Sequence, residues 1–355
     1  MKSSFEIFIK SCLGALAGLG LSLALCKFSG ESPLKVLNVL YQSSFGSGYD
    51  FGMTLFYTVP FILTGLSVAL PLRAGLFNIG AEGQLTMGAL FVACAGTLAP
   101  TVQSPFLAIS FACLLAFLGG GLWGAIAGFL KAFRGSHEVI TTIMLNFIAA
   151  GVTSYFTLYV LKNPASSQAE TVPLPDVFLL KPFEVFKGAP MGHLVWVVML
   201  LTILFWIYLK RSVWGYKLKA VGENELSSGT YGISKKRAWI SSMFVAGGIA
   251  GLVGIVEVLG NSHRFKIGFS ADYGFVGIAV ALVASGNILG IIPAAFLFGL
   301  LQKGAGSLDL ETEKVTRDFS YIIQGLIILG VASGGIWDRF FNWIHNACGK
   351  KSRAD

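Results

Sequence analysis

The sequence predicts an all-α fold, a polytopic helical membrane protein with about eight to ten transmembrane helices. Hydrophobic residues make up 54% of the 355 residues and charged residues only 12%, about half the charged share of an ordinary soluble domain. The apolar residues form unbroken stretches of about 20 residues, the length of a helix that crosses a bilayer. The 44 glycines fall among these stretches, as is common in membrane helices. This composition excludes a disordered chain and argues against a soluble enzyme.

The predicted spans follow one another along the whole chain, 1–355, which we expect to form one transmembrane domain. The eighth and ninth spans are short and interrupted by glycines, so they are either separate half-helices or one bent hairpin. In chain order, the spans are 7–26, 51–70, 83–99, 105–130, 139–161, 192–209, 239–260, 274–286, 288–302 and 319–336.

The charged residues predict how the chain is oriented in the membrane. With the N-terminus in the cytoplasm, sixteen of the 26 Lys and Arg residues fall in cytoplasmic segments, which agrees with the positive-inside rule. The loop 210–237 and the tail 337–355 are then cytoplasmic, and the proline-rich loop 162–191 lies outside, with a short surface helix expected around 177–186. Orientation in membrane lipid therefore accounts for the net charge of +8, and we expect no nucleic-acid binding.

No motif marks the chain as a nucleotide-binding enzyme or a metal site. The sequence contains no G-x-x-x-x-G-K-[ST] phosphate loop. The five cysteines form no C-x-x-C pair and mostly lie in apolar stretches, which is typical of packing residues. We expect no catalytic residue, no metal ligand and no bound cofactor on this chain. Few ionisable groups lie within spans, and Glu257 is the clearest of them.

The densest motif is the run Ala-Gly-Leu-Phe-Asn-Ile-Gly-Ala-Glu-Gly-Gln-Leu at 74–85, between the second and third spans. Its glycines allow sharp turns and close helix approach. Asn78, Glu82 and Gln84 would be costly in lipid, so they should face protein or a water-filled path. The motif is therefore either part of such a path or a polar loop at the membrane surface.

A second motif, residues 135–146, begins the fifth span. Thr142 and Asn146 are four residues apart, so they share one face of the helix. That face either lines a pore or hydrogen-bonds a neighbouring helix.

Two aromatic residues open the glycine-broken eighth span. Tyr273 and Phe275 precede and follow Gly274. They either stack on a planar ligand or anchor the helix at the membrane interface.

The loop 210–237 contains signals for a short helix. Asn224 can cap it, Glu225 falls in its first turn, and Gly232 can end it. Such a helix is suited to docking a soluble partner. The alternative is a solvated basic loop that only sets orientation.

Together these motifs resemble the membrane permease subunits of bacterial ABC importers of the ribose and branched-chain amino acid class, and most closely the longer permease of nucleoside importers. The resemblance is collinear from about Phe51 to Ala332. It rests on residues 75–85, 138–140, 145–146, 220–224, 232–233, 277–282 and 324–329. This sequence departs from the family pattern at Ser227, Ser228, Gly229, Val276, Leu308 and Asp309.

The resemblance implies a larger-type importer fold in two inverted halves, and a transport subunit that catalyses no reaction. It implies a bacterial plasma (inner) membrane location and three kinds of partner: a cytoplasmic ABC ATPase that uses ATP, a second related permease chain, and an extracytoplasmic substrate-binding protein or lipoprotein. The implied ATPase-coupling residues are Gly215, Gly222, Glu223, Asn224, Ser227, Ser228, Gly232 and Ile233. The candidate translocation path comprises Asn78, Glu82, Gln84, Thr142, Asn146, Tyr273 and Phe275.

Several functions remain open from the sequence. The resemblance favours import of nucleosides or a related ribosyl or ring compound, with riboflavin or a simple sugar as the alternative substrate. An ion-coupled secondary transporter would work alone and would depend on a buried acid such as Glu257. A structural or assembly subunit would show no transport.

Overall fold

In the computed structural model, residues 4–99, 101–186 and 188–333 are described, and over these residues the regular structure is helical apart from isolated bridges. The predicted all-α membrane fold is confirmed. The helices that carry the predicted spans are α1 (Ser4–Phe28), α3 (Gly48–Leu72), α4 (Ala81–Leu98), α5 (Pro105–Arg134), α6 (Glu138–Tyr155), α7 (Leu194–Arg211), α10 (Lys235–Gly251), α11 (Tyr273–Val283), α12 (Ile291–Glu311) and α13 (Asp318–Ala332).

Shorter elements connect or extend these helices. They are α2 (Pro33–Phe45), α8 (Val213–Glu223), α9 (Glu225–Thr230), the π-helical extensions η1 (Phe156–Val160) and η4 (Ile255–Ser262), and the 3₁₀ turns η2 (Asp176–Phe178) and η3 (Glu184–Phe186). Among the described residues, 6 helical stretches are long and apolar enough to cross a membrane: 48–72, 105–134, 138–160, 194–211, 235–262 and 291–311.

The structure corrects the predicted spans at α2 and α12, and for α11 it agrees with the half-helix, one of the two predicted alternatives. Helix α2 was not predicted, because its 13 residues mix polar and apolar side chains. Helix α12 runs unbroken for 21 residues and continues past the predicted end at residue 302. The next residue, Lys303, can stay inside the helix because its ammonium group pairs with Asp50 at 3.0 Å. Helix α11 is a half-helix of 11 residues. The predicted surface helix at 177–186 is replaced by two separate 3₁₀ turns, and the tail 337–355 lies outside the described residues.

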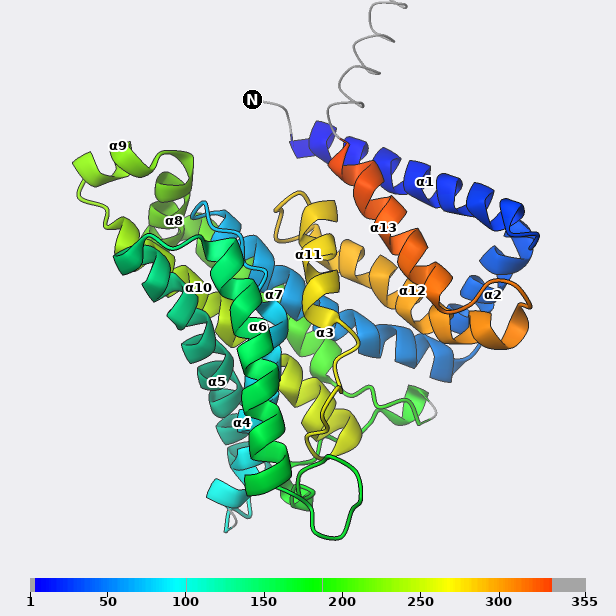
Figure 1. Cartoon of the computed structure of the whole chain (residues 1–355), viewed down its shortest axis with the longest axis horizontal. Coiled ribbons are helices and arrows are strands. Elements are labelled where there is room, and N and C mark those ends of the chain that lie inside the picture. The colour runs from blue at the N-terminus through cyan, green and yellow to red at the C-terminus, as the bar shows by residue number, and fades with distance from the viewer. Residues whose placement is uncertain (1–3, 100, 187, 334–355) are drawn as a thin grey trace, which may run out of the picture.

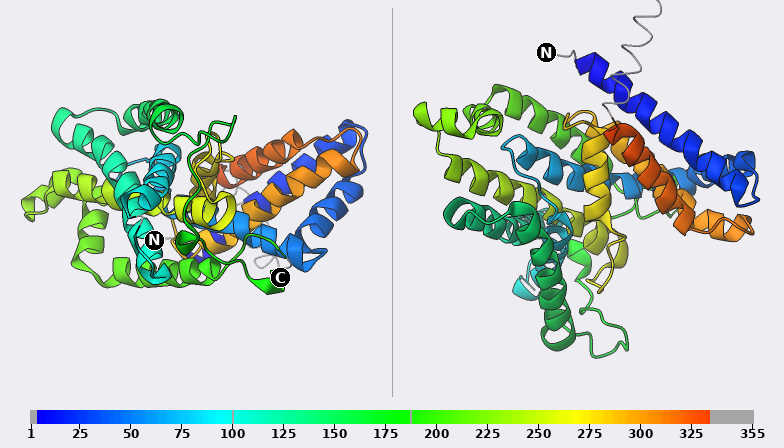
Figure 2. Two further views of the ribbon diagram at one scale, coloured as in Figure 1. Left: turned by 90° about the horizontal axis from the view of Figure 1, so that it is seen from below. Right: turned by 45° about the horizontal axis from the view of Figure 1, so that its top comes forward.

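The ends of the bundle carry different elements (Figure 1). Helices α8 and α9 lie at one end, with the start of α1 and the end of the described part of α13. The loop between α6 and α7 lies at the other end. Viewed from below, α6 and α7 lie on opposite sides of the bundle (Figure 2).

Small residues let α5 and α10 pack backbone to backbone. A Cβ on Gly120 would lie 2.9 Å from the Gly251 Cα, and a Cβ on Gly247 would lie 3.2 Å from the Gly124 Cα. Such close approach is typical of membrane helix pairs, where packing replaces the hydrophobic effect. The pair forms a rigid wall on which α3 and α4 also pack.

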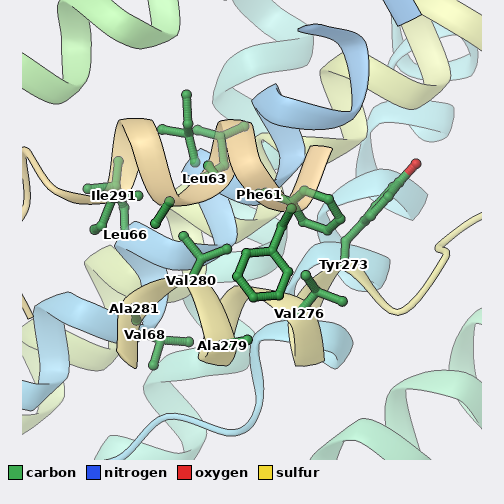
Figure 3. Packing of buried hydrophobic residues seen from close by; sticks show 14 of the residues in the cluster. Phe61, Leu63, Leu66, Val68, Tyr273, Val276, Ala279, Val280, Ala281 and Ile291 are labelled. Carbon is green, nitrogen blue, oxygen red and sulfur yellow. The ribbon is translucent and has the colours of Figure 1, made fainter. Parts of the chain in front are cut away.

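Helix α11 packs along α3 in the apolar core. Figure 3 shows Phe61 and Val68 of α3 beside Val276, Ala279 and Val280 of α11. All five side chains are buried. This packing fixes the half-helix α11 against a full span, so that its N-terminus ends inside the bundle.

Candidate functional site

The connection between α3 and α4 turns sharply and leads back into the protein. The Ala74 amide donates to the Pro71 carbonyl at 2.8 Å. Gly75 adopts φ +73°, a left-handed conformation that residues with a Cβ rarely adopt. The chain then passes through 76–80 and enters α4 at the fully buried Ala81. Helix α4 therefore begins among protein side chains and not at a surface.

A buried amide pair, Asn78 and Gln84, holds this connection. Asn78 Nδ2 donates to Gln84 Oε1 at 2.9 Å, and Gln84 Nε2 donates to Asn78 Oδ1 at 3.0 Å. Asn78 also accepts from the Gly80 amide at 3.0 Å and donates to the Ser67 carbonyl at 3.2 Å. Buried polar groups satisfied in this way specify one local conformation. Both side chains position α4 here, and their place in a translocation path stays a prediction.

Helix α6 supplies the cap that α4 lacks, because the N-cap residue Gly80 has no side chain. Asn146 Oδ1 accepts from the Gly83 amide at 2.8 Å, and its Nδ2 donates to the Ile79 carbonyl at 3.0 Å. The Ile79 amide donates to Thr142 Oγ1 at 3.3 Å. The face shared by Thr142 and Asn146 thus hydrogen-bonds a neighbouring helix, one of the two predicted interpretations. That it also lines a pore stays a prediction.

We expect Asn146→Leu to lower the thermal stability of the purified protein by the equivalent of about 1–3 kcal/mol. The substitution leaves the Gly83 amide and the Ile79 carbonyl without partners. Thermal unfolding in detergent, followed by tryptophan fluorescence, measures the effect. The exposed neighbour Phe147 offers a control, Phe147→Leu, which should unfold like the wild type. Unchanged stability with lost transport would instead assign Asn146 to the path.

The first turns of α4 and α11 meet inside the bundle. Glu82 lies in the first turn of α4, and its Oε2 accepts from the Gly274 amide of α11 at 2.8 Å. The N-cap residue of α11, Asp272, makes no side-chain cap bond. A Cβ on Gly274 would lie 2.5 Å from the Glu82 Cα, so the approach requires glycine. One carboxylate therefore lies at the positive ends of two helix dipoles.

Tyr273 points from α11 into the protein and is only 2% exposed. Its ring packs edge-on against Phe61, with 5.6 Å between the ring centroids (Figure 3). Its hydroxyl donates to Glu257 Oε1 at 2.7 Å, and Asn261 Nδ2 donates to Glu257 Oε2 at 3.0 Å. Glu257 lies in the π-helical η4, and such segments are frequent at functional sites. The structure thus surrounds Tyr273 with protein groups.

The predicted path residues differ in accessibility. Phe275 is 45% exposed. Glu82 and Asn146 are partly exposed, and the others, Asn78, Gln84, Thr142 and Tyr273, are buried. The structure therefore brings the predicted residues of α4, α6 and α11 together, with Glu82 and Phe275 on the accessible side.

The segment between α7 and α10 folds as two short helices that project from the bundle (Figure 1). Ser212 caps α8 by accepting from the Gly215 amide at 3.1 Å. Asn224 caps α9 by accepting from the Ser227 amide at 2.9 Å. This confirms the short helix predicted in the loop and the cap predicted for it, because both signals are local in the sequence.

Gly222 brings α8 into backbone contact with the connection that leads to α4. A Cβ there would overlap the Arg73 carbonyl oxygen and would lie 3.0 Å from the Gly75 amide nitrogen. Trp239 of α10 donates through Nε1 to the Ala74 carbonyl at 3.2 Å. A displacement of α8 would therefore move the α3–α4 connection, the backbone segment that leads into α4.

The two most exposed large apolar residues of this segment were not predicted as site residues. Leu226 and Tyr231 are each 84% exposed. Leu226 is two residues before the buried Ser228, so the two side chains point about 200° apart around the helix. Leu226 therefore lies on the face of α9 that points away from the protein. Among the predicted coupling residues, Gly215 and Ser228 are buried, Ile233 is partly exposed, and Gly222, Glu223, Asn224, Ser227 and Gly232 are exposed.

The loop 162–191 is tied to the segment that leads into α11. Glu170 pairs with Lys266 in an antiparallel bridge, and its Oε1 lies 2.7 Å from Arg264 Nη1. The Ser166 hydroxyl, and then the Arg264 guanidinium, hold the pKa of the Glu170 carboxyl below its usual value. Glu170 is therefore ionised near neutral pH and links the loop to the approach to α11.

Comparisons with known proteins found relatives along most of the chain. The guanosine ABC transporter permease protein NupP of Bacillus subtilis is 35% identical over 327 residues, covering 90% of this chain and 92% of NupP. The nucleoside ABC transporter permease protein NupB of Lactococcus lactis is 34% identical, covering 85% of this chain and 84% of NupB. The glucose ABC transporter permease protein TsgB13 of Haloferax volcanii is 29% identical, covering 94% of this chain and 88% of TsgB13. No solved structure matches the chain.

The apolar helices, the helix ends that meet inside the bundle and the projecting loop define a multi-pass membrane transport protein. The chain belongs to the family described as branched-chain amino acid transport system / permease component, whose model matches residues 51–332. It is therefore the permease component of an ABC transporter in the plasma membrane, a transport subunit and not a catalytic one. Helices α1 and α2 precede the matched region.

Proposed function

We propose that the chain forms the translocation path of an ATP-driven importer for nucleosides or a related ring-bearing ribosyl compound. The observation that carries this proposal is the similarity to the guanosine and nucleoside permeases, at 35% and 34% identity, against 29% for the glucose permease. The matches cover most of both chains, so the whole membrane domain is comparable.

The proposed path runs along the face that carries α6, α11 and α13 (Figure 1). Helix α6 exposes Met144 and Phe147, and α11 exposes Phe275 and Leu282. Glu82 lies between the two helices, because it contacts α11 while the next residue contacts α6. A second related permease facing this surface would complete the path, with Phe275 available to stack on a planar base.

The proposed ATPase site is the projecting segment of α8 and α9, where Leu226 and Tyr231 are exposed. A cytoplasmic ABC ATPase docked there would move α8, and Gly222 would transmit the motion to the start of α4. In this orientation, the start of α1 and the end of the described part of α13 face the cytoplasm. An extracytoplasmic binding protein would deliver substrate at the opposite end, and ATP would be used by the partner chains alone.

The test is reconstitution of the purified complex, with its ATPase and binding protein, into phospholipid vesicles. We expect guanosine to stimulate ATP hydrolysis, and labelled guanosine to enter only with ATP and without an ion gradient. If riboflavin or glucose stimulates ATP hydrolysis and guanosine does not, the importer mechanism holds and the proposed substrate is wrong. Uptake driven by an ion gradient without ATPase would contradict the importer mechanism and would direct attention to Glu257.

A further inference from the structure

An apolar groove separates α7 from the rest of the bundle. It has a volume of about 440 Å³ and lies between α7 and a wall formed by α3, α5 and α10. Leu201 and Phe205 line it from α7, and Leu66, Phe117 and Ile249 line it from the wall. Helix α7 itself is poorly covered, since only 22% of its residues are buried. The helix therefore stands along the bundle without closing against it.

The lining of the groove excludes water as a stable occupant. Thr202 is a polar side chain in this lining, and its hydroxyl donates to the Val198 carbonyl at 2.7 Å within the same helix. A buried water needs two to four polar partners, which an apolar lining does not supply. Because the groove runs along a poorly covered helix of a membrane-spanning bundle, hydrocarbon is the material available to fill it.

The length of the groove fits one lipid chain. Its lining on α7 extends from Leu194 to Tyr208, which corresponds to roughly 21 Å along the helix axis. One leaflet of a bilayer contributes about half of the 30 Å hydrocarbon thickness. The groove is therefore long enough to hold a single acyl chain over the full hydrocarbon depth of one leaflet.

The end of the groove near α8 carries positive charge. Lys210 and Arg211 lie two and three residues after the groove residue Tyr208, in the last turn of α7. Lys210 Nζ lies 4.1 Å from the centroid of the Trp206 ring. Aromatic and basic side chains at a helix end are typical of the headgroup region, and they attract anionic lipids.

We propose that this groove binds one acyl chain of an anionic phospholipid whose headgroup pairs with Lys210 and Arg211. Ser212 alone separates the end of α7 from α8. The lipid therefore sets the position of α7 and, through it, the position of α8 against the α3–α4 connection. This second step rests on the coupling role proposed above, whereas the binding of lipid does not.

The test measures retained lipid and coupling separately. The complex is reconstituted in vesicles of phosphatidylcholine with phosphatidylglycerol, purified in mild detergent and examined by native mass spectrometry. We expect retained phosphatidylglycerol, and a loss of roughly tenfold in Leu201→Trp, which fills the groove. Leu200 is exposed and does not line the groove, so Leu200→Trp should retain the lipid. Equal retention by the two variants would overturn the proposal.

The charged end is tested by a matched pair of variants. Lys210→Gln should lower retention of phosphatidylglycerol several-fold and leave retention of phosphatidylcholine unchanged. Lys162→Gln, which removes one charge at the opposite end, should change neither. Equal loss in both would contradict the headgroup assignment.

A photocrosslinker at position 201 identifies the occupant directly. Labelling of phospholipid supports the proposal, and labelling of a partner subunit would show that a protein helix fills the groove. A complex that keeps phosphatidylglycerol but does not respond to guanosine would refute the proposed substrate and leave the lipid site intact.

Discussion

Gly222→Trp is expected to abolish coupled transport while the protein remains in the membrane. The indole cannot be accommodated, because even a Cβ at this position overlaps the Arg73 carbonyl oxygen. Helix α8 must then move away from the connection at Gly75, so motion of the proposed ATPase site on α8 and α9 no longer reaches the start of α4. We expect transport to fall by more than about tenfold, with ATP hydrolysis continuing without stimulation by substrate. Uptake and ATPase assays on the same vesicles measure the two activities.

The same loop provides a control for this prediction. Gly229 has open space around the position of a Cβ, so Gly229→Ala should transport like the wild type. Gly222→Ala should already reduce transport, because the overlap involves the first side-chain atom. Normal transport by Gly222→Trp, at a normal amount in the membrane, would contradict the role of this contact in coupling.

Glu82→Ala is expected to give the second large loss, again more than about tenfold in transport. The substitution removes the acceptor of the Gly274 amide and the negative charge shared by two helix ends. Glu82→Gln keeps an acceptor oxygen and should retain part of the activity. Uptake per folded protein, with folding followed by size-exclusion chromatography, separates transport from stability.

A carboxylate far from this contact serves as the control for Glu82. Glu311 lies exposed at the end of α12, and Glu311→Ala should behave like the wild type. Full activity of Glu82→Ala would remove the α4–α11 contact from the mechanism. If Glu82→Gln loses as much as Glu82→Ala, the charge at the helix ends matters more than the hydrogen bond.

Local signals predicted much of the architecture. The apolar runs located the spans because a membrane helix satisfies its own backbone hydrogen bonds and exposes apolar side chains to lipid. The short helix after Asn224 was predicted because its cap involves residues three positions apart. Helix α2 was missed because its mixed composition resembles a loop, and the end of α12 was missed because Lys303 finds a distant partner, Asp50.

The site was only partly predictable. The sequence indicated that Asn78, Glu82 and Gln84 avoid lipid, since unpaired polar groups are costly there. It left open whether their motif belongs to a path or to a surface loop, and whether Asn146 lines a pore or hydrogen-bonds a neighbouring helix. The structure shows that Asn78 pairs with Gln84 and that Asn146 caps α4, so these two features position the helix.

The sequence by itself determined a multi-pass helical membrane protein, the order of its spans and the short capped helix in its projecting loop. Tertiary structure alone decided that Glu82 caps α11, that Gly222 contacts the α3–α4 connection, and that a groove remains behind α7. The residues of the Glu82–Gly274 contact are 192 positions apart, and neither residue carries a local signal for the other. Such contacts follow from how whole helices pack, which depends on the shapes of many side chains at once.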